Sequence, residues 1–155
     1  MNRLGIDIGS TTVKVIITDE KNNILYGEYQ RHLANIQNCL SNLLKNAIEK
    51  LGDIDVNTCI TGSGGLSLSN ALNVNFTQEV IAVSTSLKTL NGKCDVAVEL
   101  GGEDAKIIYF DGNSVDQRMN GICAGGTGSF IDQMAALLKT DASGLNEYAK
   151  SYKMI

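Results

Sequence analysis

The sequence predicts an α/β protein made of two related halves, the second of which is incomplete. Three segments of strand length followed by a helical pattern occur twice along the 155 residues. In each half, the first of these segments is apolar, carries one acidic residue and ends in a glycine-containing turn. Hydrophobic residues make up 43% of the chain and charged residues 19%, values typical of a folded globular protein rather than a disordered one.

The first half begins with three expected strands, at 3–9, 12–19 and 24–31. The polar turn at 19–23 has the composition of a hairpin connection between the last two. A helix is expected over 35–51, because its apolar residues recur at steps of three and four. These are Ile36, Leu40, Leu43, Leu44, Ala47, Ile48 and Leu51. Gly52 then ends the helix, and Cys39, beside the apolar stripe, is expected in the core.

The rest of the first half alternates strand and helix. A strand is expected over 54–60, with Cys59 packed inside, and the glycine turn at 61–65 leads into a short helix near 66–72. A further helix is expected over 77–90, with Thr77 as its cap.

The polar break at 91–93 is the expected boundary between the halves, which gives domains at 1–92 and 93–155. The second half restarts with strands near 95–100, 105–110 and 114–119. A glycine-rich loop and a helix near 127–139 follow. No residues are left for a later strand and helix like those of the first half, so the second half is expected to be incomplete.

The turn after the first strand has the chemistry of a phosphate and metal cradle. Asp7 stands where a carboxylate can hold Mg²⁺, directly or through water. Gly9 allows a close approach of the backbone to a ligand, and Ser10, Thr11 and Thr12 offer hydroxyl and N–H donors to phosphate oxygens. The alternative is an ordinary hairpin with a polar turn.

The segment 96–110 repeats this design, with Glu99 as the acid, Gly101 and Gly102 as the turn, and polar residues before the next strand. Two such units about ninety positions apart suggest two related half-domains that face one cleft. We expect the phosphate chain of one nucleotide to lie between them.

A third motif, at 119–132, joins Cys123 to a glycine-rich helix start. Glycines there expose N–H groups at a helix N-terminus, which attracts anions, and Thr127 or Ser129 is expected to cap the helix or touch phosphate. The same position favours a thiolate at Cys123, the form that binds metal. The alternative is a buried cysteine before a capped helix.

Composition narrows the range of partners and compartments. The net charge of −4 and the scattered basic residues argue against nucleic acid or an anionic membrane. No apolar run approaches the roughly 20 residues that span a bilayer, and the chain enters a strand at once, so neither a membrane span nor a signal peptide is expected. The four cysteines form no C-x-x-C pair, which disfavours a zinc ribbon. A cytoplasmic location is expected, where a disulfide framework is uncommon.

Together the three motifs resemble the ATPase activators of 2-hydroxyacyl-CoA dehydratases and the related ATPase subunits of benzoyl-CoA reductase. This group belongs to the superfamily of acetate and sugar kinases, heat-shock chaperones and actin. The matching segments are 5–14, 101–106 and 120–128, and the resemblance runs from about residue 3 to 140.

The resemblance implies a duplicated ribonuclease H-like fold of the actin-like ATPase type, with MgATP or MgADP between two domains and one [4Fe–4S] cluster shared across a homodimer. ATP turnover would drive a low-potential electron to an iron–sulfur CoA-ester dehydratase or reductase. Asp7 and Glu99 would flank Mg²⁺, Cys123 would ligate the cluster, and Asp7 or Glu103 would orient the attacking water. The residues expected to line the nucleotide are Gly9, Ser10, Thr11, Thr12, Lys14, Gly101, Gly102, Asp104, Gly125, Gly126, Thr127 and Gly128.

The sequence departs from the family pattern in ways that suggest a longer polypeptide. Glu99 and Glu103 stand where Asp and Gln are usual, and neither a second cluster cysteine nor the late adenosine-binding glycine motif occurs before Ile155. These variants, with 117–120, are closer to a subgroup in which the activator is fused to dehydratase-like domains. Two copies of Cys123 supply two of the four thiolates that a cluster needs, so no intact cluster is expected in this chain by itself.

Two other functions are compatible with the sequence. A small-molecule kinase of the same superfamily would phosphorylate a sugar or a carboxylate and would not need Cys123. A non-catalytic nucleotide-binding or docking domain would bind a partner without turnover.

Overall fold

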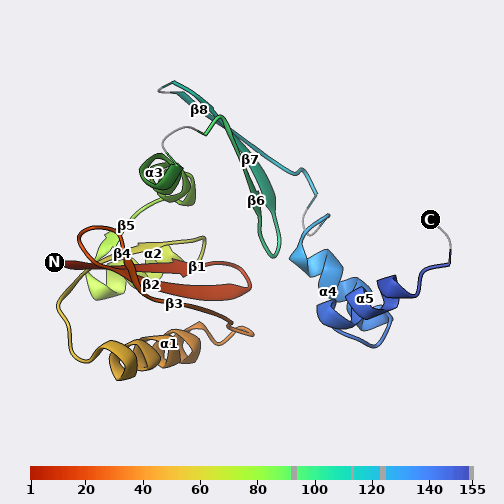
Figure 1. Ribbon diagram of the computed structural model, residues 1–155, viewed down its shortest axis with the longest axis horizontal. Coiled ribbons are helices and arrows are strands. Elements are labelled where there is room, and N and C mark those ends of the chain that lie inside the picture. Colours follow the sequence, from red (N-terminus) through yellow and green to blue (C-terminus); the bar gives the residue numbers. More distant parts are fainter. Residues whose placement is uncertain (92–93, 113, 123–124, 154–155) are drawn as a thin grey trace. The chain divides into compact units, whose positions relative to one another are not determined.

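The computed structural model describes residues 1–91, 94–112, 114–122 and 125–153. The chain divides into two compact units, unit 1 (Met1–Cys94) and unit 2 (Asp95–Ile155). Figure 1 labels the helices and strands of both units.

Unit 1 is a five-stranded mixed sheet with three helices. The strand order is β3-β2-β1-β4-β5; β1, β2 and β3 form an antiparallel meander, and β4 and β5 continue from β1 in parallel. The helix α1 supplies the crossover that a parallel return to β1 requires, and Figure 1 shows it running along the sheet. The elements are β1 (Asn2–Ile8), β2 (Thr12–Thr18), β3 (Ile24–Arg31), α1 (Ile36–Leu51), β4 (Val56–Thr61), α2 (Gly65–Leu72), β5 (Asn75–Phe76) and α3 (Glu79–Asn91).

The core of unit 1 lies between the sheet and α1. Alternate residues of β1 and β2 face it, because successive side chains of a strand point to opposite faces. From α1, the buried residues are Cys39, Leu40, Leu43 and Ala47, as expected for most of the stripe. The expectation for Ile48 is wrong: its side chain is 60% exposed, because it lies at the edge of a stripe centred on Leu40 and Leu43.

Capping residues determine where α1 begins and ends. At the start, the side-chain Oδ1 of Asn35 accepts the N–H of Asn38 at 3.4 Å. Gly52 ends the helix, as predicted, with a left-handed φ of 74° and an N–H that donates to the Ile48 carbonyl.

The later part of unit 1 differs from expectation at two places. Thr77 does not cap α3, which begins at Glu79; the Thr77 N–H donates instead to the Ile60 carbonyl at 2.9 Å and continues the β4–β5 pairing. The strand β5 was not expected, since two residues are too short to show alternation.

Unit 2 contains an antiparallel meander, β6 (Val96–Leu100), β7 (Ala105–Asp111) and β8 (Ser114–Met119). Two helices follow, α4 (Gly128–Leu137) and α5 (Ala142–Lys150). The helix α4 ends before the expected 139, where Lys139 adopts a left-handed φ of 55°. The sequence analysis missed α5, although Asp141 is a typical cap and accepts the Gly144 N–H at 2.8 Å.

Within the described ranges, no helix has both the length and the apolar character needed to cross a membrane.

Candidate functional site

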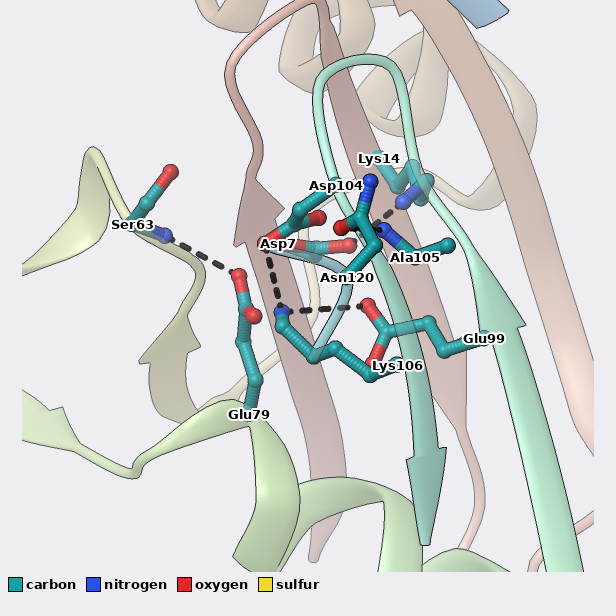
Figure 2. A network of polar contacts seen from close by, with 9 residues as sticks. All are labelled: Asp7, Lys14, Ser63, Glu79, Glu99, Asp104, Ala105, Lys106 and Asn120. Atoms are coloured by element: carbon teal, nitrogen blue, oxygen red, sulfur yellow. Dashed lines mark hydrogen bonds and ion pairs between the residues drawn. The ribbon is translucent and has the colours of Figure 1, made fainter. Parts of the chain in front are cut away.

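The first acid turn joins β1 to β2 and pairs a carboxylate with a lysine. Asp7 lies directly opposite Lys14 in the antiparallel ladder, and the Lys14 ammonium donates to Asp7 Oδ2 at 2.7 Å (Figure 2). The Gly9 N–H donates to the Thr12 carbonyl at 2.9 Å and closes the turn. Ser10 is exposed at the tip, and the Asp7 side chain keeps 29% of its surface accessible. The turn therefore presents a carboxylate and small hydroxyl residues to solvent.

A second glycine turn, at 62–65 after β4, supports Asp7 from the neighbouring strand. The carboxyl ends of β1 and β4 meet at one edge because the two strands are parallel. The Gly64 N–H donates to the Ile8 carbonyl at 2.9 Å, and Gly62 lies so close that an added Cβ would stand 2.6 Å from Asp7 Oδ1. From the sequence alone, this turn was expected only to connect a strand to a helix; the signal for its role is its place after a strand parallel to β1.

The glycine turn is itself held by α3. The Ser63 N–H donates to Glu79 Oε1 at 3.1 Å, and Figure 2 shows the Glu79 side chain reaching the turn from the first turn of the helix. Beside it, Thr61 stands opposite Asp7 in the parallel ladder, and its buried hydroxyl has no hydrogen-bond partner among the described residues. Thr61 thus places an available hydroxyl next to the acid.

His32, the only histidine of the chain, contacts the same turn, and the sequence analysis did not select it. It follows β3, keeps 9% of its surface exposed, and places ring Nε2 3.2 Å from the Gly9 carbonyl. Its own N–H donates to the Thr11 carbonyl at 3.1 Å. An isolated histidine has no local sequence pattern that reveals such contacts.

The second acid turn, between β6 and β7, repeats the first one. Glu99 lies opposite Lys106 as Asp7 lies opposite Lys14, seven residues apart in both pairs. The Lys106 ammonium is 3.6 Å from Glu99 Oε1 and 3.3 Å from Asp104 Oδ2, and its side chain is only 10% exposed (Figure 2). The Gly101 N–H donates to the Asp104 carbonyl, just as the Gly9 N–H donates to the Thr12 carbonyl in the first turn. In both turns the glycine stands two residues after the acid.

Asn120 connects this turn to the loop that follows β8. Its side-chain Oδ1 accepts the Ala105 N–H at 3.0 Å, and its side-chain Nδ2 donates to the backbone carbonyls of Ile122 at 2.7 Å and Gly125 at 3.1 Å. Figure 2 shows Asn120 beside Ala105 at the start of β7. Glu103, the other candidate for orienting water, is exposed in the turn.

The start of α4 does not present its N–H groups as the sequence analysis expected. The Gly128 N–H donates to the Gly101 carbonyl at 3.1 Å, and the Ser129 N–H to the Gly102 carbonyl at 2.7 Å. Thr127 occupies the cap position, but its side chain makes no capping bond, and its buried hydroxyl is without a hydrogen-bond partner in the described part of the chain. The predicted cluster ligand Cys123 lies outside the described residues.

The donor sets differ in how well they suit a metal or a cluster. Asp7 suits Mg²⁺, because its carboxylate is partly accessible and Mg²⁺ often takes one or two protein carboxylates with water and phosphate. Among the residues with described positions, no group of three or more His, Cys, Asp and Glu side chains forms a metal site. Cys39 belongs to the core, where burial raises the pKa of its thiol, so it does not suit an iron–sulfur cluster.

The strand order of unit 1 and the repeated acid turns define a domain of the actin-like ATPase fold. The same fold occurs in the ethanolamine utilization protein EutJ from Carboxydothermus hydrogenoformans, with a TM-score of 0.66 over 95% of this chain at 16% identity. The chain belongs to the BadF/BadG/BcrA/BcrD ATPase family, which matches residues 4–151.

Similar proteins of known role include the (R)-2-hydroxyglutaryl-CoA dehydratase activating ATPase of Acidaminococcus fermentans, 31% identical over 157 residues, with 98% of this chain and 60% of that protein covered. The crystal structure of dehydratase component A from this organism superimposes with a TM-score of 0.84 at 27% identity over 100% of this chain and 61% of that one. The 2-hydroxyisocaproyl-CoA dehydratase activator of Clostridium difficile, with bound ADPNP, gives a TM-score of 0.82 at 26% identity over 99% and 58% of the two chains. The chain thus spans about three fifths of the length of these relatives.

Proposed function

We propose that this chain supplies two phosphate- and metal-binding turns to an ATPase that activates a CoA-ester dehydratase. The observation that carries the proposal is the repeated hairpin, in which an acid faces a lysine and a glycine turn closes two residues later. Two copies of one arrangement, placed after the first strand of each unit, indicate selection for a shared ligand chemistry rather than for a turn alone. The ligand of this proposal is ATP or ADP with Mg²⁺.

In this proposal Asp7 holds Mg²⁺, and Glu99 supplies the second acid. The bound metal would neutralise charge on the phosphates, which is most of what phosphoryl transfer to water requires from a protein. Asp7 or Glu103 would orient the attacking water. The residues that would line the nucleotide are Gly9, Ser10, Thr11, Thr12, Lys14, Gly101, Gly102, Asp104, Gly125, Gly126, Thr127 and Gly128.

The finer part of the proposal concerns electron transfer. ATP turnover would be coupled to delivery of an electron from a [4Fe–4S] cluster to an iron–sulfur dehydratase or reductase, with Cys123 as a ligand in a longer, homodimeric polypeptide of the cytoplasm. Support comes from relatives of this chain that activate 2-hydroxyglutaryl-, 2-hydroxyisocaproyl- and lactoyl-CoA dehydratases. The thiols whose positions are described do not form a cluster site.

The test replaces Asp7 by Asn, with Asp55→Asn as the matched control. Both changes remove one negative charge, but Asp55 is an exposed acid before β4. Isothermal titration with ATP is carried out with Mg²⁺ and again with EDTA, and ATP hydrolysis is measured in the longest natural polypeptide that contains the chain. We expect Asp7→Asn to abolish the gain in affinity that Mg²⁺ provides and to lower turnover more than about tenfold, since a metal ligand acts on the charged transition state.

Asp55→Asn should leave both measurements unchanged. Binding of MgATP by Asp7→Asn with the wild-type affinity and the wild-type turnover would remove Asp7 from the site and contradict the proposal.

A further inference from the structure

We propose that His32 is a positioning residue that clamps the first acid turn in the conformation that receives a nucleotide phosphate; the identity of this ligand rests on the proposed function. His32 lies between β3 and α1, outside the turn itself. It is nonetheless bonded to the turn through both its backbone and its ring.

The hydrogen bonds fix the state of the ring. The Ala34 N–H donates to ring Nδ1 at 3.1 Å, so Nδ1 is an acceptor and carries no hydrogen. The remaining ring hydrogen is then on Nε2, which donates to the Gly9 carbonyl at 3.2 Å. The two backbone partners thus select one tautomer of the ring.

The clamp holds carbonyls on both sides of Ser10. Ring Nε2 holds the Gly9 carbonyl, and the His32 N–H holds the Thr11 carbonyl at 3.1 Å. In a trans peptide the C=O and the N–H point in opposite directions, and no cis peptide bond is present among the described residues. Because the Gly9 carbonyl points at His32, the Ser10 N–H of the same peptide points away from it. The exposed turn thereby presents a fixed amide donor, the group that backbone phosphate sites use.

The loop after His32 is shaped to keep the ring in place. Leu33 and Ala34 both have left-handed φ angles, 46° and 64°, which are unfavourable for residues with side chains. This backbone bends the chain so that the Ala34 N–H returns to ring Nδ1 and the Asn35 N–H returns to the His32 carbonyl at 2.6 Å. The loop therefore holds the ring so that its other nitrogen, Nε2, faces the Gly9 carbonyl.

Two variants separate the two ring contacts. In His32→Asn, the amide oxygen can take the place of Nδ1 and keep the Ala34 bond, while the contact to Gly9 is lost. In His32→Gln, the longer amide can take the place of Nε2 and still donate to the Gly9 carbonyl. Both variants remove the ring, so the matched pair differs mainly in the bond to the turn.

The full chain is studied with and without nucleotide. Without nucleotide, hydrogen exchange of the Gly9 amide reports on the turn, because this N–H is bonded to the Thr12 carbonyl. We expect His32→Asn to lower the protection of this amide and to raise the Kd for MgATP about fivefold, the effect of one neutral hydrogen bond, while His32→Gln stays within about twofold of the wild type. Thermal unfolding should show similar midpoints for the two variants.

The outcomes distinguish this inference from the proposed function. Failure of the wild-type chain to bind MgATP, with Gly9 protection still lost in His32→Asn alone, would overturn the proposed ligand but keep the clamp. Equal Gly9 protection in the wild type and both variants, or equal loss of affinity in Asn and Gln variants, would overturn the clamp itself.

Discussion

Replacement of Gly62 by alanine tests the contact between the glycine turn and Asp7. Gly62 has a left-handed φ of 94°. An added Cβ would stand 2.3 Å from the Ile8 carbonyl oxygen and 2.6 Å from Asp7 Oδ1, much closer than van der Waals contact allows. Ile8 is wholly buried, so its backbone cannot move without displacing the end of β1. The substitution must therefore separate the two parallel strands locally.

Gly52→Ala is the matched control for this change. Gly52 has a similar φ of 74°, but no described atom lies within 4 Å of an added Cβ. An alanine at such a φ costs about 1–3 kcal/mol of stability, and Gly52, with a ψ of −167°, lies in a region that glycine almost alone populates. Overpacking adds roughly 1–3 kcal/mol at Gly62 alone. We therefore expect Gly62→Ala to lose about 2 kcal/mol more than Gly52→Ala.

Thermal unfolding followed by circular dichroism measures the difference. At about 4–8 °C per kcal/mol for a domain of the size of unit 1, Gly62→Ala should lower the midpoint by roughly 10 °C more than Gly52→Ala does. The expected loss of MgATP affinity in Gly62→Ala, measured well below its midpoint, follows from the displaced Asp7 carboxylate. Equal midpoints for the two variants would refute the reasoning, because backbone strain alone would then explain both.

Two further predictions concern other hydrogen-bonding groups. Hydrogen bonds from the Tyr26 hydroxyl and, to a smaller extent, from the Asn46 side-chain amide hold the pKa of Glu28 below its ordinary 4.5. Burial and, to a smaller extent, the neighbouring Glu28 raise the pKa of Tyr26 to about 12, so the Tyr26 hydroxyl keeps its proton. A lowered carboxyl pKa stabilises the fold above about pH 4.5, and this stabilisation is lost as the pH falls through the folded-state pKa. Urea unfolding measured between about pH 5 and 3 should therefore show a smaller loss of stability on acidification in Glu28→Gln than in the wild type. An unchanged pH dependence would exclude this role of Glu28. Thr127→Val should keep the unfolding midpoint within about 3 °C of the wild-type value, since the buried Thr127 hydroxyl has no partner among the described residues. The same variant should bind MgATP more weakly in calorimetry, because the proposed site uses this hydroxyl as a ligand of the nucleotide. Unchanged affinity would remove Thr127 from the proposed site.

Most elements of the fold were predictable because their signals are local. In the strands of both meanders, apolar residues either alternate with polar ones or follow one another between polar turns. The helix α1 shows a clear apolar stripe of helical period between Asn35 and Gly52. The strand β5 was missed because it exists only through its pairing with β4. Ile48 was misplaced because periodicity gives a stripe but not the direction in which tertiary packing turns it.

The parts of the site that consist of residues close together in the sequence were predictable. Asp7, Glu99 and their glycine turns follow a strand directly, so the motif is visible. The contacts of Gly62 and His32 depend on the parallel β1–β4 pairing and on the path of the β3–α1 loop, which no local pattern encodes. The role of Lys106 was available from the sequence, because its spacing from Glu99 equals that of Lys14 from Asp7.

The two main-chain bonds between the Gly101–Gly102 turn and the start of α4 also have a mechanical consequence. They tie each glycine of the turn to a residue of the helix start, so that a displacement of either glycine must move Gly128 or Ser129 or break a hydrogen bond. The helix has 10 residues and is therefore about 15 Å long. Because a tilt of a rod moves its far end the most, a change in the glycine turn that tilted the first turn of α4 would displace its last turn by a larger distance.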